Sequence, residues 1–164
     1  MKVIMTGGGT GGHIYPAIAI ADKIKEEQPD AEILFIGTDH GLEKKIVPQS
    51  GYPIKFVTAE GIDRKNLLKN VDVARKLLKG KMEAKRIVED FKPDIVIATG
   101  GYVSAPVIKA GFKYGAKVYI HESNAFPGLT NKVSENTRRK FFSDSLTRQS
   151  TSNSLKSTCL REIR

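Results

Sequence analysis

The 164-residue sequence contains one cysteine, Cys159. A single thiol supports neither a disulfide framework nor a cysteine-based metal cluster, so we expect a protein without metal from a reducing compartment such as the cytoplasm. No apolar run approaches the roughly 20 residues that cross a bilayer. The N-terminus also lacks the apolar segment of a signal peptide. We therefore expect one cytoplasmic domain, long enough to bury a hydrophobic core.

Two catalytic motifs of α/β proteins are missing as well. No Lys-Ser or Lys-Thr pair follows the first glycines, where His13 and Ile14 stand instead, so the P-loop pattern fails. No Gly-x-Ser-x-Gly elbow is present, which argues against the chemistry of α/β-hydrolases.

Acidic residues are in the minority, and the formal net charge is +9. This excess predicts an anionic partner: nucleic acid, an acidic lipid or a phosphorylated substrate. Nucleic acid is the least favoured of the three, because no platform of aromatic and basic residues accompanies the charge. We expect no nucleic-acid partner.

The chain begins with a short apolar run, Val3 to Met5, followed by five glycines within residues 7–12 and then by His13. A helix is predicted from about Pro16 to Glu27, since proline is favoured in a first helical turn. Strand, glycine turn and helix in this order form the phosphate-binding geometry of doubly wound α/β domains. The imidazole of His13 is a candidate for positioning a substrate or accepting a proton.

A dinucleotide cofactor is poorly supported in spite of these glycines. Dinucleotide-binding domains place an acid at the end of the second strand to hold a ribose. Here the second strand, predicted over 32–36, is followed by Gly37 and Thr38, and Asp39 comes slightly late. We expect no cofactor.

Apolar runs predict further strands and helices in alternation. Strands are expected over 54–58, 95–98 and 117–120, and helices over 42–47, 81–91 and 106–114. Gly80 is expected to separate the helix over 81–91 from the segment before it. The alternation predicts an α/β fold: a doubly wound, Rossmann-like parallel sheet with helices on both faces.

Two more strands end in polar or glycine turns. Gly100, Gly101 and Tyr102 follow the strand over 95–98, and His121, Glu122 and Asn124 follow the strand over 117–120. Ligands of open α/β sheets bind at this carboxyl edge, so we expect the turns to face one ligand, a pyrophosphate or a sugar. Tyr102 is either a stacking wall or ordinary loop packing.

Residues 65–85 combine bulky aliphatic and basic side chains, a composition that suits the surface of an anionic membrane. The alternative is a core-packing helix with a solvated basic face. The pairs Leu67-Leu68 and Leu77-Leu78 make the apolar face of the helix wider than core packing requires, which favours contact with a membrane. The candidates for membrane contact are Leu67, Leu68, Lys69, Arg75, Leu77, Leu78 and Lys79.

Three segments, read together, resemble the N-terminal domain of the MurG family of peptidoglycan N-acetylglucosaminyltransferases: TGGGTGGHIYPAIAIA at residues 6–21, TGGYVSAP at 99–106 and HESNAFPGLTNK at 121–132. That family transfers GlcNAc from UDP-GlcNAc to the C4 hydroxyl of lipid I, the undecaprenyl-diphospho-muramoylpentapeptide of cell-wall synthesis, and serves cell division and cell shape. The resemblance implies the N-terminal half of a glycosyltransferase B fold. It also implies a cytoplasmic protein, peripheral on the inner face of the bacterial plasma membrane.

The resemblance also implies roles for individual residues. Thr10, Gly11 and Gly12 would line the donor sugar-phosphate end of the cleft, joined by Asn124. The glycine turns, with Gly100, Gly101 and Tyr102, would face the acceptor pyrophosphate. His13 would activate or orient the acceptor hydroxyl, with Glu122 as the second candidate or as its electrostatic partner. The UDP-sugar itself would be held mainly by a C-terminal domain.

The resemblance covers residues 1–132, the expected acceptor-binding domain. Residues 133–164, rich in Ser, Thr, Lys and Arg, are expected to be a disordered or non-native tail, with a genuine regulatory tail as the alternative. Without the donor domain the chain is expected to be inactive alone. Two alternatives stay open: one subunit of a two-chain UDP-sugar transferase, and a stand-alone nucleotide-binding module.

Overall fold

The computed structural model describes residues 1–59, 70–121 and 160–163, the last range and residues 70–74 by their backbone alone. Its centre is one six-stranded sheet in the order β3-β2-β1-β4-β5-β6. Five strands are parallel, and β6 is antiparallel to β5. The strands are β1 (Lys2–Gly7), β2 (Glu32–Gly37), β3 (Ile54–Phe56), β4 (Ile95–Gly100), β5 (Lys117–His121) and β6 (Leu160–Ile163).

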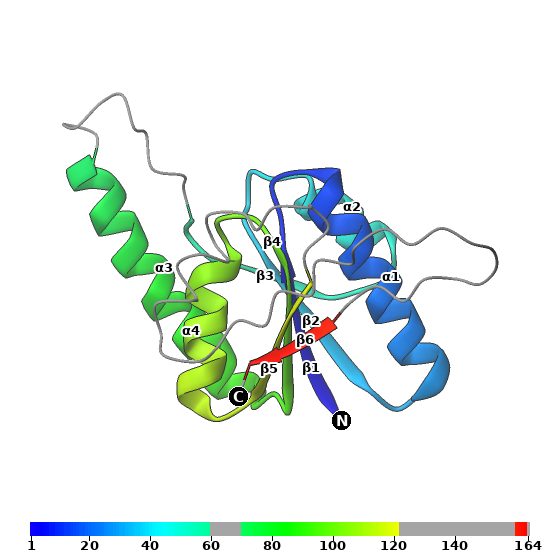
Figure 1. Ribbon diagram of the computed structural model, residues 1–164. Helices are drawn as coiled ribbons and strands as arrows, with labels where there is room; N and C mark the ends of the chain where they lie inside the picture. Colours follow the sequence, from blue (N-terminus) through cyan, green and yellow to red (C-terminus); the bar gives the residue numbers. More distant parts are fainter. Residues whose placement is uncertain (60–69, 122–159, 164) are drawn as a thin grey trace, which may run out of the picture.

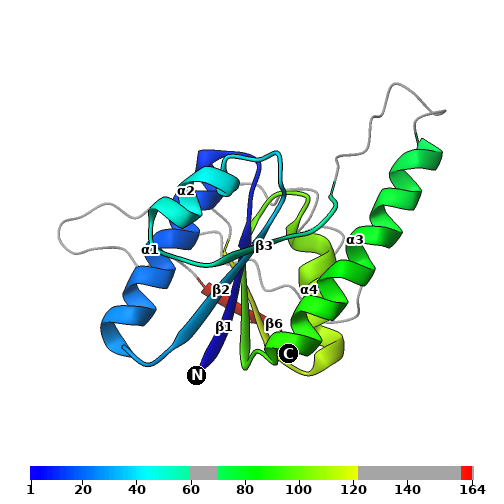
Figure 2. The same cartoon turned by 180° about the vertical axis from the view of Figure 1, so that it is seen from behind.

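Four helices cover the two faces of the sheet (Figures 1 and 2). Helices α1 (Gly11–Glu27) and α2 (Glu43–Gln49) lie on one face, and α3 (Asn70–Phe91) and α4 (Ser104–Tyr114) on the other. Successive side chains of a strand point to opposite faces. Val3 and Met5 accordingly belong to the α1 side of the core, while Ile4 belongs to the α3 and α4 side. The predicted doubly wound parallel sheet is confirmed.

Prolines do not mark the helix boundaries that the sequence predicted. Helix α1 begins at Gly11, because the N–H groups of His13 and Ile14 both donate to the carbonyl of Thr10 and close the first turn there. Pro16 therefore lies inside α1, where it lacks the N–H that would donate to the carbonyl four residues back. Pro48, which was expected to stop α2, also lies inside its helix.

The prediction that Gly80 separates two helices is wrong, because α3 runs unbroken through it. A Cβ atom on Gly80 would collide with the carbonyl oxygen of Thr58, in the segment that follows β3. Thr58 is fixed to the same helix by Glu83, whose carboxylate accepts a hydrogen bond of 2.6 Å from the Thr58 N–H. Gly80 is thus a site of close packing rather than a break.

The C-terminal part of the chain is described only at β6, a strand that the sequence did not predict. The expected boundary between residues 132 and 133, and the rest of the expected tail, lie outside the described residues. Within the part of the chain that is described, no helix combines the length and the apolar character needed to span a bilayer.

Candidate functional site

Two glycine turns meet at the carboxyl edge of the sheet. They follow β1 and β4, adjacent strands whose next helices lie on opposite faces, so the turns flank the point at which the strand order reverses. The N–H of Gly8 donates to the carbonyl of Gly100 over 3.2 Å. Gly101 has a φ of 88°, and a Cβ there would collide with the carbonyl of Gly8. The two turns are therefore in direct contact, at the place where doubly wound sheets bind ligands.

The N-terminus of α1 presents free backbone donors beside these turns. Thr10 is its N-cap residue and makes no side-chain cap hydrogen bond. Among the described residues, no group accepts a hydrogen bond from the backbone N–H of Thr10, Gly11 or Gly12. Three such groups at the positive end of a 17-residue helix form an anion-binding arrangement.

His13 is held between α1 and the second glycine turn. Its Nδ1 lies 2.9 Å from the carbonyl oxygen of Thr99. A carbonyl can only accept, so Nδ1 carries a proton, and in the corresponding uncharged tautomer the lone pair lies on Nε2. The ring packs against the α-carbon of Gly100, and the Thr99 hydroxyl donates to the His13 carbonyl over 2.6 Å. Nε2 makes no hydrogen bond with the described residues.

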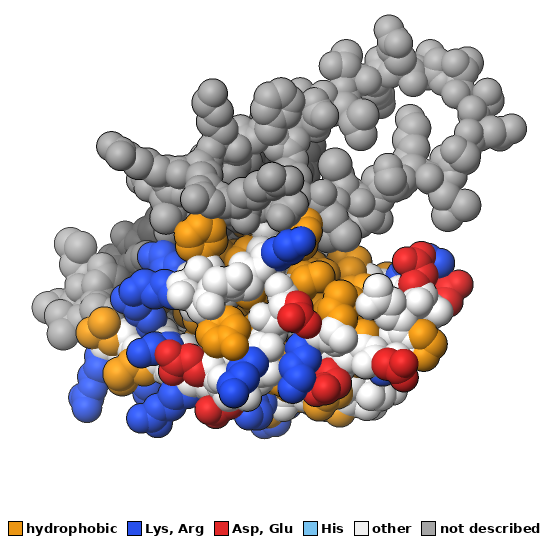
Figure 3. All heavy atoms as spheres, turned by 90° about the horizontal axis from the view of Figure 1, so that it is seen from below, with side chains coloured by type: hydrophobic (Ala, Val, Ile, Leu, Met, Phe, Trp, Pro, Cys, Tyr) orange, Lys and Arg blue, Asp and Glu red, His pale blue; other side chains and the backbone are white. Residues whose placement is uncertain are grey.

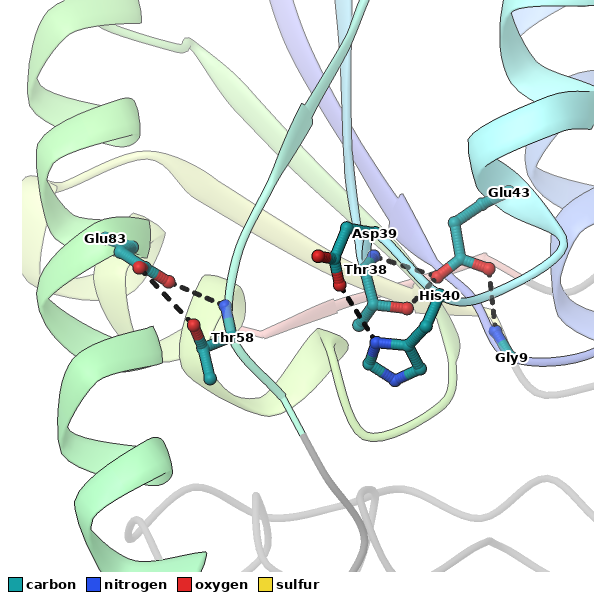
Figure 4. Close-up of polar contacts among 7 residues, drawn as sticks. All are labelled: Gly9, Thr38, Asp39, His40, Glu43, Thr58 and Glu83. Atoms are coloured by element: carbon teal, nitrogen blue, oxygen red, sulfur yellow. Dashed lines mark hydrogen bonds and ion pairs between the residues drawn. The ribbon is translucent and has the colours of Figure 1, made fainter.

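Glu43, in the first turn of α2, belongs to the site but was not predicted. Its side chain is fully buried, at 0% exposure. Figure 4 shows its carboxylate between the first glycine turn and the end of β2. The carboxylate accepts hydrogen bonds from the Gly9 N–H at 2.9 Å, the Thr38 N–H at 2.9 Å and the Thr38 hydroxyl at 2.7 Å. Burial raises the pKa of Glu43, but these bonds to the charged form outweigh it and leave the pKa below its ordinary value.

Three glycines make room for this carboxylate. A Cβ on Gly8 or Gly41 would collide with the carboxylate itself, and a Cβ on Gly37 would lie 2.5 Å from the Cγ of Glu43. A sequence signal for Glu43 therefore existed: an acid in the first turn of the helix after the second strand, preceded by Gly37 and Gly41. From the sequence alone, these glycines could not be distinguished from glycines that only form a turn.

The nearest acids do not suit a ribose. Glu43 is occupied by three donors, and Asp39 is exposed and lies 3.0 Å from the Nδ1 of His40. That hydrogen bond is the largest cause of the lowered pKa of Asp39. No cluster of three or more His, Cys, Asp or Glu side chains that could hold a metal ion occurs among the residues the structure describes.

A cavity of about 290 Å³ opens between the turns. Its lining includes Gly8, Gly9, His40 and Glu43, together with the exposed Tyr102 of the second turn. His13 is not part of its lining. A second cavity, of about 310 Å³, shares His40 with the first and extends to Lys79 on α3.

The structure describes only some of the predicted site residues. The structure brings Thr10, Gly11, Gly12 and His13 together with the second turn. Glu122 and Asn124 lie outside the described residues.

The structure also describes only some of the residues predicted to contact a membrane. Leu67, Leu68 and Lys69 are outside the described residues, whereas four others lie exposed on α3: Arg75, Leu77, Leu78 and Lys79. Leu78 is 64% and the neighbouring Met82 61% exposed. The other half of the helix packs into the core through Ala84, Ile87 and Val88. Helix α3 therefore packs into the core through Ala84, Ile87 and Val88 and exposes apolar side chains at Leu77, Leu78 and Met82.

The fold is a Rossmann-like, doubly wound domain with two glycine turns at the carboxyl edge of its sheet. The profile of the Glycosyltransferase family 28 N-terminal domain matches residues 3–143, so the chain belongs to this family of glycosyltransferases. The match extends past residue 132, where the resemblance seen in the sequence ended.

Similar proteins carry the name UDP-N-acetylglucosamine--N-acetylmuramyl-(pentapeptide) pyrophosphoryl-undecaprenol N-acetylglucosamine transferase. The one from Alkaliphilus oremlandii is 60% identical over 133 residues, which are 81% of this chain and 36% of that protein. The one from Clostridioides difficile is 54% identical over 140 residues, or 85% of this chain and 34% of that protein. The chain spans about a third of the length of these relatives.

Solved structures agree with the family. The crystal structure of MurG from Acinetobacter baumannii matches with a TM-score of 0.72 and 28% identity, over 90% of this chain and 43% of that chain. The Streptomyces glycosyltransferase SsfS6 matches with a TM-score of 0.59 and 16% identity, over 82% of this chain and 42% of that one, and supports the fold alone. The resemblance to the MurG family is confirmed.

Proposed function

We propose that this chain is the acceptor-binding part of an inverting transferase that moves GlcNAc from UDP-GlcNAc to the C4 hydroxyl of lipid I. The observation that carries the proposal is the pair of glycine turns joined by the Gly8 to Gly100 hydrogen bond. Beside them lie the N–H groups of Thr10 to Gly12, for which the described residues provide no acceptor. The names of the relatives at 54% and 60% identity supply the reaction. The donor would be held mainly by a domain outside this chain.

In this reaction the C4 hydroxyl oxygen of the acceptor bonds to the anomeric carbon of GlcNAc. The bond from that carbon to the diphosphate oxygen breaks, UDP leaves with the electron pair, and the hydroxyl proton goes to a base. His13 is the proposed base, because its bond to the Thr99 carbonyl leaves Nε2 as the proton acceptor. The free N–H groups at the start of α1 would stabilise negative charge on a diphosphate.

A matched pair of glycine variants tests acceptor binding. Gly101 and Gly115 have φ values of 88° and 96°, so alanine strains the backbone equally at both. Only at Gly101 would the new Cβ meet another turn, since nothing lies within 4 Å of a Cβ at Gly115. We expect Gly101→Ala to weaken lipid I binding by at least about tenfold and Gly115→Ala to leave it unchanged. The proposal is wrong if the wild-type chain binds NAD tightly and neither lipid I nor UDP-sugars.

Turnover gives the second test. Transfer of labelled GlcNAc from UDP-GlcNAc to lipid I should be absent with this chain alone and should appear when a donor domain is supplied. Robust turnover by the chain alone would contradict the assignment of an acceptor-binding part.

We also propose that the exposed side chains of α3 between Arg75 and Met82 contact an anionic membrane, which would place the protein at the inner face of the plasma membrane. On the side where α3 lies, Lys and Arg side chains gather with hydrophobic side chains between them (Figure 3). Exposed apolar groups beside cations are what an interfacial helix requires. The second cavity is lined by Lys79 on this surface and by His40, which also lines the first cavity.

Vesicles of anionic lipid test the membrane contact. Replacing Leu77 and Leu78 with serine should reduce cosedimentation with the vesicles several-fold, because it removes exposed apolar area. Leu42→Ser is the control, since Leu42 is 53% exposed at the start of α2, on the other face of the sheet. Equal loss in both variants, or none in either, would count against this surface.

A further inference from the structure

Glu43 is an anion already bound where a phosphate would be expected. Glycine turns at the start of a helix usually offer their N–H groups to a phosphate. In this chain the Gly9 N–H donates to the carboxylate of Glu43 instead, and the Gly8 N–H donates to Gly100. The first donors left for a ligand are those of Thr10, Gly11 and Gly12.

The carboxylate is fixed independently of the turn. Thr38 donates to it twice, from its N–H and from its hydroxyl, and Thr38 directly follows β2 in the sheet. Gly9, by contrast, has a φ of 86°, and no atom of the described residues lies within 4 Å of the place where its Cβ would be. The hydrogen bond from Gly9 to Glu43 therefore connects the first glycine turn, at a residue with open space around its Cβ position, to the edge of the sheet.

We propose that Glu43 is a positioning residue that fixes the first glycine turn so that the N–H groups of Thr10, Gly11 and Gly12 converge on the diphosphate of the ligand. This inference rests on the proposed function, because it assumes a diphosphate at these groups. Glu43 acts through the turn and touches no reacting atom.

Because Glu43 is charged, the direction in which Glu43→Gln changes the affinity for an anionic ligand tests the proposal. Removing a negative charge near an anionic ligand should by itself strengthen binding. Removing the anchor of the turn should weaken it, because the donors lose their shared geometry. Glu43→Gln does both, and a loss of affinity can come only from the second cause.

The experiment uses the 164-residue chain labelled with ¹⁵N and inorganic pyrophosphate as the probe. We expect wild-type signals of Thr10, Gly11 and Gly12 to shift on titration, and Glu43→Gln to bind at least about tenfold more weakly. Glu32→Gln is the control: it removes the same charge at an exposed residue at the opposite end of the sheet, and it should leave the affinity unchanged. Equal or tighter binding by Glu43→Gln would overturn the inference.

Amide relaxation without ligand gives an independent readout. Residues 8–12 should gain motion in Glu43→Gln while the signals of the strands stay unchanged, and unchanged motion would overturn the inference. If Glu43→Gln does not fold, Thr38→Val takes its place, since it removes one donor, keeps the charge and should weaken binding by roughly threefold. Unchanged affinity in Thr38→Val would then count against the inference. A wild-type chain that binds no pyrophosphate contradicts the proposed function, and the motion of residues 8–12 then decides the inference by itself.

Discussion

Gly80→Ala should destabilise the protein, although alanine is the better helix former. In an unconstrained helix interior this substitution stabilises by about 1 kcal/mol. Here the new Cβ would collide with the Thr58 carbonyl oxygen and lie 3.0 Å from the carbonyl carbon. Thr58 cannot easily retreat, because its N–H is bonded to Glu83 on the same helix.

The magnitude follows from two opposing effects. Forcing an extra carbon into a packed contact costs about 1–3 kcal/mol, and more where the neighbour is backbone. Because the neighbour is a backbone carbonyl, we take the upper end of this range, about 3 kcal/mol. Subtracting the gain of about 1 kcal/mol in helix propensity leaves a net loss of about 2 kcal/mol. For a chain of this size that corresponds to a fall in Tm of about 4–8 °C.

Thermal and urea unfolding of Gly80→Ala measure this loss, with Gly12→Ala as the matched control. Gly12 also lies in a helix, but the nearest atom to the position of its Cβ is the Oγ1 of Thr10, at an ordinary contact distance of 3.8 Å. Alanine there should leave stability unchanged or raise it by up to about 1 kcal/mol. If Gly80→Ala is as stable as wild type, α3 can move away from Thr58 and the close contact does not explain the glycine.

Two other predictions concern single residues of the site. The pKa of Glu43 lies below its ordinary value of 4.5 in the folded chain, so its stabilising contribution is complete above about pH 4.5 and is lost as the pH falls through the lower folded pKa. Urea unfolding between about pH 3 and pH 6 should show this loss in wild type, and the corresponding slope should be smaller in Glu43→Gln. His13→Ala, in an enzyme that includes a donor domain, should reduce turnover by roughly two to four orders of magnitude. A near-normal rate would transfer the role of base to Glu122.

The strands and their glycine turns were predictable because their signals are local. Each parallel strand is a short apolar run, and each turn follows directly in the sequence, so Ile95 to Tyr102 could be read without knowledge of the fold. The edge at which the turns meet also followed, since parallel strands place their carboxyl ends together. Helix boundaries were less predictable, because Pro16 and Pro48 are tolerated inside helices whose first turns are closed by earlier residues.

Gly80 and Glu43 could not be predicted for the same physical reason. The role of Gly80 depends on Thr58, 22 residues earlier, and that of Glu43 on Gly9, 34 residues earlier. A glycine in a basic helical segment has a local interpretation as a break, and a glutamate in a first turn has one as a favourable charge near the helix N-terminus. Only the fold shows that the contact with Thr58 explains Gly80 and that the hydrogen bond from Gly9 explains Glu43.

The glycines at the edge of the sheet serve different purposes, and this decides where an anion can bind. Gly8, Gly37 and Gly41 lack side chains because Glu43 occupies that space, and Gly101 lacks one because the first turn passes against it. Neither requirement involves a ligand. Gly12 has no neighbour that demands a glycine, and together with Thr10 and Gly11 it leaves its N–H free among the described residues. The abundance of glycine in this turn is therefore evidence for a phosphate only at residues 10–12, and a diphosphate seated on Gly8 and Gly9 would have to displace a carboxylate that three donors already hold.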